Sequence, residues 1–200
     1  DLLRRFVTER GGGFLMLGGQ ESFQQADFQH TPIAAILPVY LDRLPEAHLN
    51  PQMQLHLTRE GWLQPWTRLR DNEDDERQRL AEMPEFRVLN RLSATKPGAR
   101  VVAALGDAET EVFPALVVQR LGNGRTAALT VGDIWRWGQH SPENRADMEK
   151  FWRQTLRWLI ADVPDRIAFE ARSEPDAVSE PTTLQIRVRD ERFEPLDNVS

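Results

Sequence analysis

Two places in the sequence hold the residue types that acid–base or nucleophilic chemistry needs. At the first, Glu21 and Ser22 follow two glycines, Gly18 and Gly19. A serine hydroxyl becomes a nucleophile only beside a general base, and the Gly-x-Ser-x-Gly pattern of a hydrolase nucleophile turn is absent here. Ser22 is therefore a candidate nucleophile or a hydroxyl that caps a turn, and Glu21 is a candidate acid or base.

The second place holds Asp133 and His140. Asp133 ends a predicted inner strand, where a carboxylate often faces a ligand; its alternative role is to hydrogen-bond the surrounding backbone. His140 precedes Ser141-Pro142-Glu143, which is typical of a helix start, with serine as N-cap, proline at the first position and glutamate near the positive end of the dipole. A lone histidine after a loop is usually solvated, so His140 is either a solvated side chain or an acid–base group.

Aromatic and cationic residues follow Asp133. If this segment is extended, Trp135 and Trp137 point to one side and Arg136 to the other. The functional interpretation is an aromatic and cationic lining beside the two glycines, and the alternative is a tryptophan pair packed under the last helix, with Arg136 paired to a carboxylate such as Asp133. The candidate ligand-binding crevice comprises Gly18, Gly19, Gln20, Trp135 and Arg136.

Metal and nucleotide sites are not indicated. The spacing of metal ligands is missing among His30, His48 and His56, and the acidic run 71–76 lacks the spacing and glycine of a calcium loop. That run predicts a solvated loop and the start of a helix. The glycines do not form Gly-x-Gly-x-x-Gly. We therefore expect no metal and no bound cofactor.

Composition excludes several classes of protein. The chain has 200 residues, with 25 Lys and Arg against 31 Asp and Glu, a net charge of −6. Without a basic block, nucleic-acid binding is not expected, because it rests on neutralising phosphates. There is no cysteine, which rules out disulfides, Cys–zinc sites and a thiol nucleophile within these residues. No apolar run is long enough for a transmembrane span.

The elements that must position these residues follow an α/β pattern. Four apolar segments predict strands: 14–17, 100–105, 115–120 and 126–131. Residues 14–17, an uninterrupted apolar run, predict a central parallel strand buried on both faces. Gly122-Asn123-Gly124 predicts a hairpin between the last two strands. Residues 2–10 and the segment from Ser141 predict helices, and residues 54–58 an edge strand. Ligands of such sheets bind at the carboxyl ends of the parallel strands.

A second pattern begins after Pro164. Residues 166–171 and 182–190 predict strands, separated by the Pro- and Glu-rich stretch 173–181, and they are typical of the start of an immunoglobulin-like β-sandwich. We therefore expect two domains, 1–163 and 164–200. The first helix and strand have no strand before them, so we also expect the chain to be a piece of a longer protein that lacks N-terminal strands.

Several motifs, taken in order, resemble those of a known family. They are Gly11-Gly12-Gly13-Phe14-Leu15-Met16-Leu17-Gly18-Gly19, Ser22-Phe23, Thr31-Pro32, Leu37-Pro38, Leu57-Thr58-x-Glu60-Gly61, Lys96-Pro97-Gly98-Ala99, Gly122-x-Gly124-Arg125, Asp133-x-Trp135-Arg136-Trp137, Phe151-Trp152-Arg153 and Trp158-Leu159. Their order and spacing over residues 1–163 resemble the class I glutamine amidotransferase-like proteins, and within them a bacterial branch of uncharacterised amidotransferase domains.

The resemblance implies a flavodoxin-like three-layer sandwich with a mostly parallel sheet. It also implies a Cys-His-Glu triad, whose cysteine sits on a turn where backbone amides receive the oxyanion. Here the matching turn offers Gly18 and Gly19, and His140-Ser141-Pro142-Glu143 resembles the family's His-Pro-Glu with one residue inserted. Without a thiol, glutamine hydrolysis by the family's route is not available to these residues.

Two functional hypotheses follow, and whether the chain is an enzyme stays open, with the missing thiol arguing against it. The first is a catalytically silent module for binding or assembly. Its partners would be other domains of the same chain, a second copy or another protein. Members of the branch sit in larger bacterial proteins with membrane helices and integrin-like or immunoglobulin-like domains, so the resemblance implies the soluble part of an envelope protein. The second is a hydrolase that uses the same crevice without a thiol.

Overall fold

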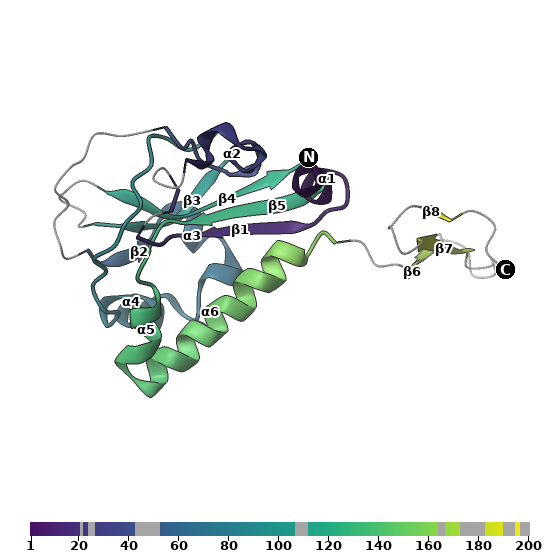
Figure 1. Cartoon of the computed structure of the whole chain (residues 1–200). Coiled ribbons are helices and arrows are strands. Elements are labelled where there is room, and N and C mark those ends of the chain that lie inside the picture. The colour runs from purple at the N-terminus through teal and green to yellow at the C-terminus, as the bar shows by residue number, and fades with distance from the viewer. Residues whose placement is uncertain are drawn as a thin grey trace. The chain divides into compact units, whose positions relative to one another are not determined.

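The computed structural model describes residues 1–20, 22–23, 27–42, 53–106, 112–163, 167–172, 183–189 and 195–196 (Figure 1). The chain divides into two compact units, Asp1–Asp162 and Val163–Ser200. No helix in the described ranges is long and apolar enough to cross a membrane. Glu21 and the Pro- and Glu-rich stretch 173–181 lie outside the described residues.

The first unit contains a five-stranded sheet. Its strands are β1 (Gly13–Leu17), β2 (Leu55–Leu57), β3 (Arg100–Leu105), β4 (Phe113–Leu121) and β5 (Gly124–Leu129), in the order β1-β5-β4-β3-β2. Strand β1 pairs in parallel with β5, and the other three pairs are antiparallel. The sheet is therefore mixed, and the expectation of a mostly parallel sheet is wrong.

Strand β1 lies at one edge of this sheet among the described strands, so the expected central position of residues 14–17 is also wrong. Its apolar run has another cause. Phe14 and Met16 pack against one apolar cluster and Leu15 against the other, which places apolar contacts on both faces of the strand. A strand covered on both faces needs apolar side chains at every position, whether or not it has two neighbours.

Helices cover the two faces of the sheet (Figure 1). They are α1 (Leu2–Thr8), α2 (Pro32–Ile36), α3 (Arg59–Trp62), α4 (Glu73–Ala81), α5 (Trp135–His140) and α6 (Pro142–Ile160), with short 3-10 helices η1 (Phe28–His30) and η2 (Pro65–Thr67). The face toward α4, α5 and α6 holds the larger core cluster, and α2 contributes to the smaller cluster on the opposite face. The unit is thus a mixed α/β fold with the sheet between helices.

Local signals place the hairpin and the long helix where the sequence predicts them. Strands β4 and β5 turn through Gly122, whose φ is +59°, and pair from Leu121↔Gly124 onward. At the start of α6 the Ser141 side chain accepts a hydrogen bond from the Asn144 N–H, with Pro142 in the first turn. Both predictions are confirmed.

The second unit is a three-stranded antiparallel sheet of β6 (Ile167–Arg172), β7 (Thr183–Arg189) and β8 (Pro195–Leu196), in that order. The register pairs Ile167 with Val188 and Phe169 with Ile186, so these side chains share one face. Ile167, Phe169 and Ile186 are exposed within the described residues.

Candidate functional site

The backbone N–H groups of Gly18 and Gly19 hold the turn after β1 in place by hydrogen bonds. The Gly18 N–H donates to the Leu129 carbonyl at 2.7 Å, and the Gly19 N–H donates to Ser22 Oγ at 2.6 Å. A Cβ on Gly18 would lie 2.6 Å from the Thr130 carbonyl oxygen, whereas a Cβ on Gly19 would meet nothing closer than 3.7 Å. Gly18 is therefore required by close packing, and both glycine N–H groups already have acceptors.

Asn90 completes this turn, and sequence analysis did not find it. Its Nδ2 donates to the carbonyls of Gly19 at 3.0 Å and Thr130 at 2.9 Å, and its Oδ1 accepts from Ser22 Oγ at 3.1 Å. The side chain thus joins the end of β1 to the residue after β5. Asn90 lies in an irregular segment between α4 and β3, where a single asparagine gives no sequence signal for this role. The Ser22 hydroxyl thus makes the hydrogen bonds expected of a hydroxyl that caps a turn.

Asp133 is buried and hydrogen-bonds the backbone. Its Oδ2 accepts from the Arg87 N–H at 3.0 Å and its Oδ1 from the Val88 N–H at 3.2 Å, while Arg136 Nε lies 3.8 Å away. Both carboxylate oxygens are therefore engaged in holding residues 87–88 against the end of the sheet. These contacts fit the alternative in which Asp133 hydrogen-bonds the surrounding backbone. The position of Arg136 fits the alternative in which it pairs with a carboxylate such as Asp133.

Residues 135–137 are helical, so the condition under which both tryptophans would point to one side, an extended segment, is not met. Helix α5 forms because the Arg136 and Trp137 N–H groups donate back to the Asp133 and Ile134 carbonyls. Positions two apart on a helix point in different directions. Trp135 is accordingly 55% exposed, whereas Trp137 is 2% exposed and packs against Phe151 of α6. Only one tryptophan of the expected pair packs under the last helix.

The remaining candidates are separate from the turn. His140 is exposed at the end of α5 and makes no hydrogen bond or ion pair with the residues that the structure describes, and Gln20 is also exposed. Ser22, Gly19 and Asn90 form one hydrogen-bonded group, and Asp133 with Arg136 forms a second, ion-paired group. Within the described ranges no hydrogen bond or ion pair joins the two groups, and no cluster of three His, Asp or Glu residues could hold a metal ion.

A groove of about 670 Å³ lies at the opposite edge of the sheet, along β2. Its lining includes His56, Trp62 and Arg77, and the Arg77 guanidinium lies 5.0 Å from the centroid of the Trp62 ring. Burial lowers the pKa of His56, which favours its neutral form. None of the candidate residues predicted from the sequence lines this groove.

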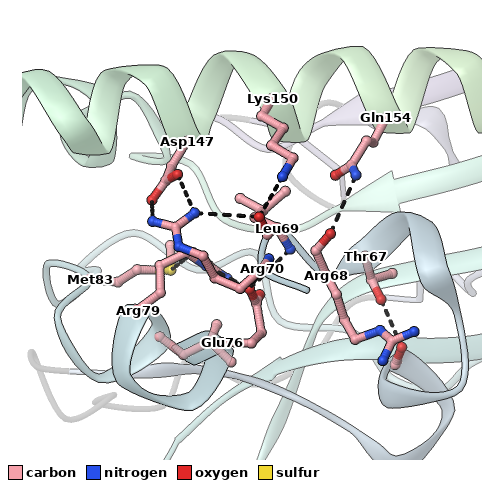
Figure 2. A network of polar contacts seen from close by, with 12 residues as sticks. Thr67, Arg68, Leu69, Arg70, Glu76, Arg79, Met83, Asp147, Lys150 and Gln154 are labelled. Carbon is pink, nitrogen blue, oxygen red and sulfur yellow. Dashed lines mark hydrogen bonds and ion pairs between the residues drawn. The ribbon is translucent and has the colours of Figure 1, made fainter. Parts of the chain in front are cut away.

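A buried polar network joins the segment before α4 to α4 and α6 (Figure 2). Glu76 is fully buried; its Oε2 accepts from the Leu69 and Arg70 N–H groups at 3.0 and 2.9 Å, and its Oε1 accepts from Arg79 at 2.6 Å. Arg70 in turn forms two hydrogen bonds with Asp147 at 2.7 and 2.8 Å, which raise the pKa of the guanidinium. The expectation that the acidic run is solvated is wrong for Glu76.

Lysine and glutamine side chains of α6 complete the network. In Figure 2, Lys150 and Gln154 point from α6 toward the same segment, where they donate to the carbonyls of Leu69 and Arg68 at 2.5 and 3.3 Å. The network therefore fastens residues 68–70 by side chains from two helices. Every one of these contacts is internal to the fold, so the network positions the segment 68–70 against α4 and α6.

Comparisons with known proteins agree with this fold. Two solved structures are similar: the cytoplasmic protein STM3548 from Salmonella typhimurium, with a TM-score of 0.58 at 20% identity, and the cytoplasmic protein STM1381 from Salmonella typhimurium LT2, with 0.52 at 22%. They cover 78% and 80% of this chain, which spans only 58% and 59% of theirs. No curated protein matches.

The sequence itself matches a family model. The model described as "Putative glutamine amidotransferase" matches residues 1–161, which is four fifths of the chain. The match covers the turn at Gly18 and Gly19, the sheet and helix α6, and the residues it covers contain no cysteine. By this match, the chain belongs to the glutamine amidotransferase-like family.

Proposed function

We propose that residues 1–163 form a glutamine amidotransferase-like domain that binds a partner or ligand and does not hydrolyse glutamine. The observation that carries the proposal is the turn after β1. It holds Gly18 and Gly19 where the family's thiol is expected, and none of the 200 residues is a cysteine. A thiolate nucleophile is the group that the family's reaction requires.

The hydrogen bonds of this turn also support a silent site. An oxyanion hole needs backbone N–H groups aimed at the position where the oxyanion forms. Here the Gly18 N–H is used by the Leu129 carbonyl and the Gly19 N–H by Ser22 Oγ. To receive an oxyanion, either N–H would have to give up an acceptor within the fold. The turn is therefore organised for stability.

The hydrolase alternative finds less support in the contacts of Ser22. Its hydroxyl is placed to donate to Asn90 Oδ1, an amide oxygen that is not a useful general base. Among the described residues, neither a histidine nor a carboxylate accepts from Ser22. We therefore assign Ser22 and Asn90 to holding the turn, with Asp133 holding residues 87–88.

The architecture that we propose around this site is a flavodoxin-like three-layer sandwich followed by an immunoglobulin-like domain that starts near residue 164. The alternating apolar residues of β6 and β7 support the second part, because the core of a β-sandwich is made by two such faces packed together. We propose that the second sheet of the same β domain covers the face of Ile167, Phe169 and Ile186. In this arrangement the β domain is a spacer or interaction module of a larger bacterial envelope protein.

Two assays test the proposed function. The 200-residue chain is incubated with glutamine and with p-nitrophenyl acetate, and release of ammonium and of p-nitrophenol is compared with that from the Ser22→Ala variant. We expect no ammonium, and ester cleavage that Ser22→Ala leaves unchanged. Ester hydrolysis that disappears in Ser22→Ala while the variant keeps its thermal unfolding temperature would support the hydrolase instead.

A further inference from the structure

A second groove, of about 610 Å³, lies at the other end of the sheet from the turn after β1. Arg125 begins β5 beside Gly13, the first residue of the parallel strand β1, whereas Gly18 and Gly19 follow the last residue of β1. The residues that line the groove include Arg100, Arg120, Arg125 and Trp158. It is thus separate from the site that the family resemblance points to.

The register of the sheet brings the three arginines to one face. Arg120 of β4 is the cross-strand partner of Arg125 of β5, and Arg100 of β3 is the partner of Val118, two residues before Arg120. Residues two apart on a strand, and residues paired across strands, point to the same face. Like charges directly opposite each other destabilise a sheet, so this placement calls for a counter-charge.

Among the residues that the structure describes, Asp162 supplies the one carboxylate that contacts these cations. Arg125 binds Asp162 through Nε at 2.6 Å and Nη2 at 3.1 Å, and Arg120 reaches the same carboxylate at 3.1 Å. These contacts lower the pKa of the Asp162 carboxyl, which keeps it charged. Arg100 is exposed and has no hydrogen bond or ion pair with any residue that the structure describes. Counted over the described residues, the groove therefore carries an excess of two positive charges.

Trp158 gives the groove an aromatic wall that is held in place. Its ring stacks on Trp66 with centroids 4.9 Å apart, and the Arg125 guanidinium lies 5.1 Å from its centroid. Arg125 also donates to the Trp158 carbonyl at 2.9 Å. An indole and a guanidinium that are fixed before binding lose little conformational entropy when a ligand arrives.

We propose that this groove binds a phosphate monoester of a small, flat organic molecule. A phosphate monoester carries close to two negative charges at neutral pH, which matches the excess of two positive charges in the groove. Its oxygens accept the paired N–H groups of guanidinium, so Arg100 and Arg120 hold the phosphate while Arg125 keeps Asp162. The flat organic group lies against the part of Trp158 that lines the groove and that Trp66 and Arg125 leave uncovered. The volume of the groove is within the range of small-molecule sites.

Isothermal titration calorimetry of the 200-residue chain with phenyl phosphate tests the proposal. We expect one site per chain with a dissociation constant below about 1 mM at low salt, and weaker binding of inorganic phosphate, which lacks the ring. Arg100→Gln should raise the dissociation constant about tenfold or more. Arg100→Lys should raise it by less, because lysine keeps the positive charge but lacks the paired N–H donors of guanidinium. Arg153→Gln is the matched control: it removes the same charge from an exposed position of α6 outside the groove.

Several outcomes would overturn the proposal. They are no saturable binding of phenyl phosphate up to about 10 mM, equal weakening by Arg153→Gln and Arg100→Gln, and succinate binding as tightly as phenyl phosphate, which would make the groove a carboxylate site. A thermal unfolding curve for each variant confirms that it is folded. Arg120→Gln provides a second substitution in the groove, and an unchanged dissociation constant in both arginine variants would also contradict the assignment.

Discussion

Substituting Glu76 by alanine probes the buried network that fastens residues 68–70. Glu76 is 0% exposed and Arg79 6% exposed, with 2.6 Å between the guanidinium and the carboxylate. Alanine leaves the Arg79 charge buried without its partner and removes the acceptor of the Leu69 and Arg70 N–H groups. The perturbation therefore combines an unpaired buried charge with two lost backbone hydrogen bonds.

The expected cost can be worked out from these contacts. Removing one member of a buried ion pair costs about 3–5 kcal/mol. A buried donor left without an acceptor costs about 1–3 kcal/mol, which applies fully to Leu69 and only in part to Arg70, whose half-buried position allows water to reach it. Since these contributions overlap at one carboxylate, we expect Glu76→Ala to lower the free energy of unfolding by about 4–6 kcal/mol. Glu76→Gln keeps an acceptor oxygen and should cost about half as much.

The assay is urea-induced unfolding followed by tryptophan fluorescence and far-UV circular dichroism, extrapolated linearly to water. Glu73→Ala on the same helix is the control, because its ion pair with Arg77 is 61% exposed on both sides and should contribute at most about 0.5 kcal/mol. A loss below about 1.5 kcal/mol for Glu76→Ala, or equal losses for the two alanine variants, would refute the reasoning. If Glu76→Ala does not fold at all, Glu76→Gln supplies the measurement.

Three further predictions concern pH, packing and domain structure. Burial lowers the pKa of His56 in the folded chain. The neutral His56 side chain therefore contributes its full stability above the unfolded-state pKa of about 6.5, and this contribution is lost as the pH falls below that value. The His56→Gln variant should show a smaller decline in the free energy of unfolding between about pH 7.5 and 5.5. Gly18→Ala should lower the free energy of unfolding by about 1–3 kcal/mol, because the new Cβ would lie 2.6 Å from the Thr130 carbonyl oxygen. Gly19→Ala should cost less. Equal losses of unfolding free energy in urea would argue against this packing. A chain ending at Val163 should keep cooperative thermal unfolding, and loss of cooperativity would show that the following residues belong to the first unit's core.

The sequence predicts best where neighbouring residues decide the structure. The N-cap of α6 depends on Ser141 and a backbone N–H three residues later, and the β4–β5 hairpin depends on Gly122 with positive φ. Both signals are complete within a few residues, so no distant contact can easily override them. The alternation of residues 184–188 in β7 is local in the same sense.

Prediction fails where the pattern of a segment does not specify which groups it will contact. The apolar run of β1 reports that both faces are covered, but nothing in it encodes which strands pair beside it. The three residues of Trp135-Arg136-Trp137 fit a strand period as well as a helical turn, and hydrogen bonds to Asp133 and Ile134 select the helix. Burial of Glu76 depends on backbone N–H groups seven and six residues away.

Of the candidate-site residues, those with local contacts could be predicted from the sequence, and the one with distant contacts could not. Ser22 was identified because it follows the two glycines, and its contact with Gly19 is local. Asn90, which lies 71 residues from Gly19 in the sequence, joins the turn only through tertiary structure. A polar side chain that serves a distant backbone leaves no periodicity or spacing by which a single sequence could reveal it.

Release of ammonium from [δ-15N]glutamine, followed by NMR, tests most directly the claim that this amidotransferase-like domain lacks glutaminase chemistry. With about 10 µM protein and one hour of incubation, a turnover of about 0.001 per second is detectable, about four orders of magnitude below a typical enzyme rate. The absent thiol and the engaged N–H groups of Gly18 and Gly19 predict no ammonium above the heat-denatured control. Ammonium that accumulates in proportion to the concentration of folded protein would contradict the account.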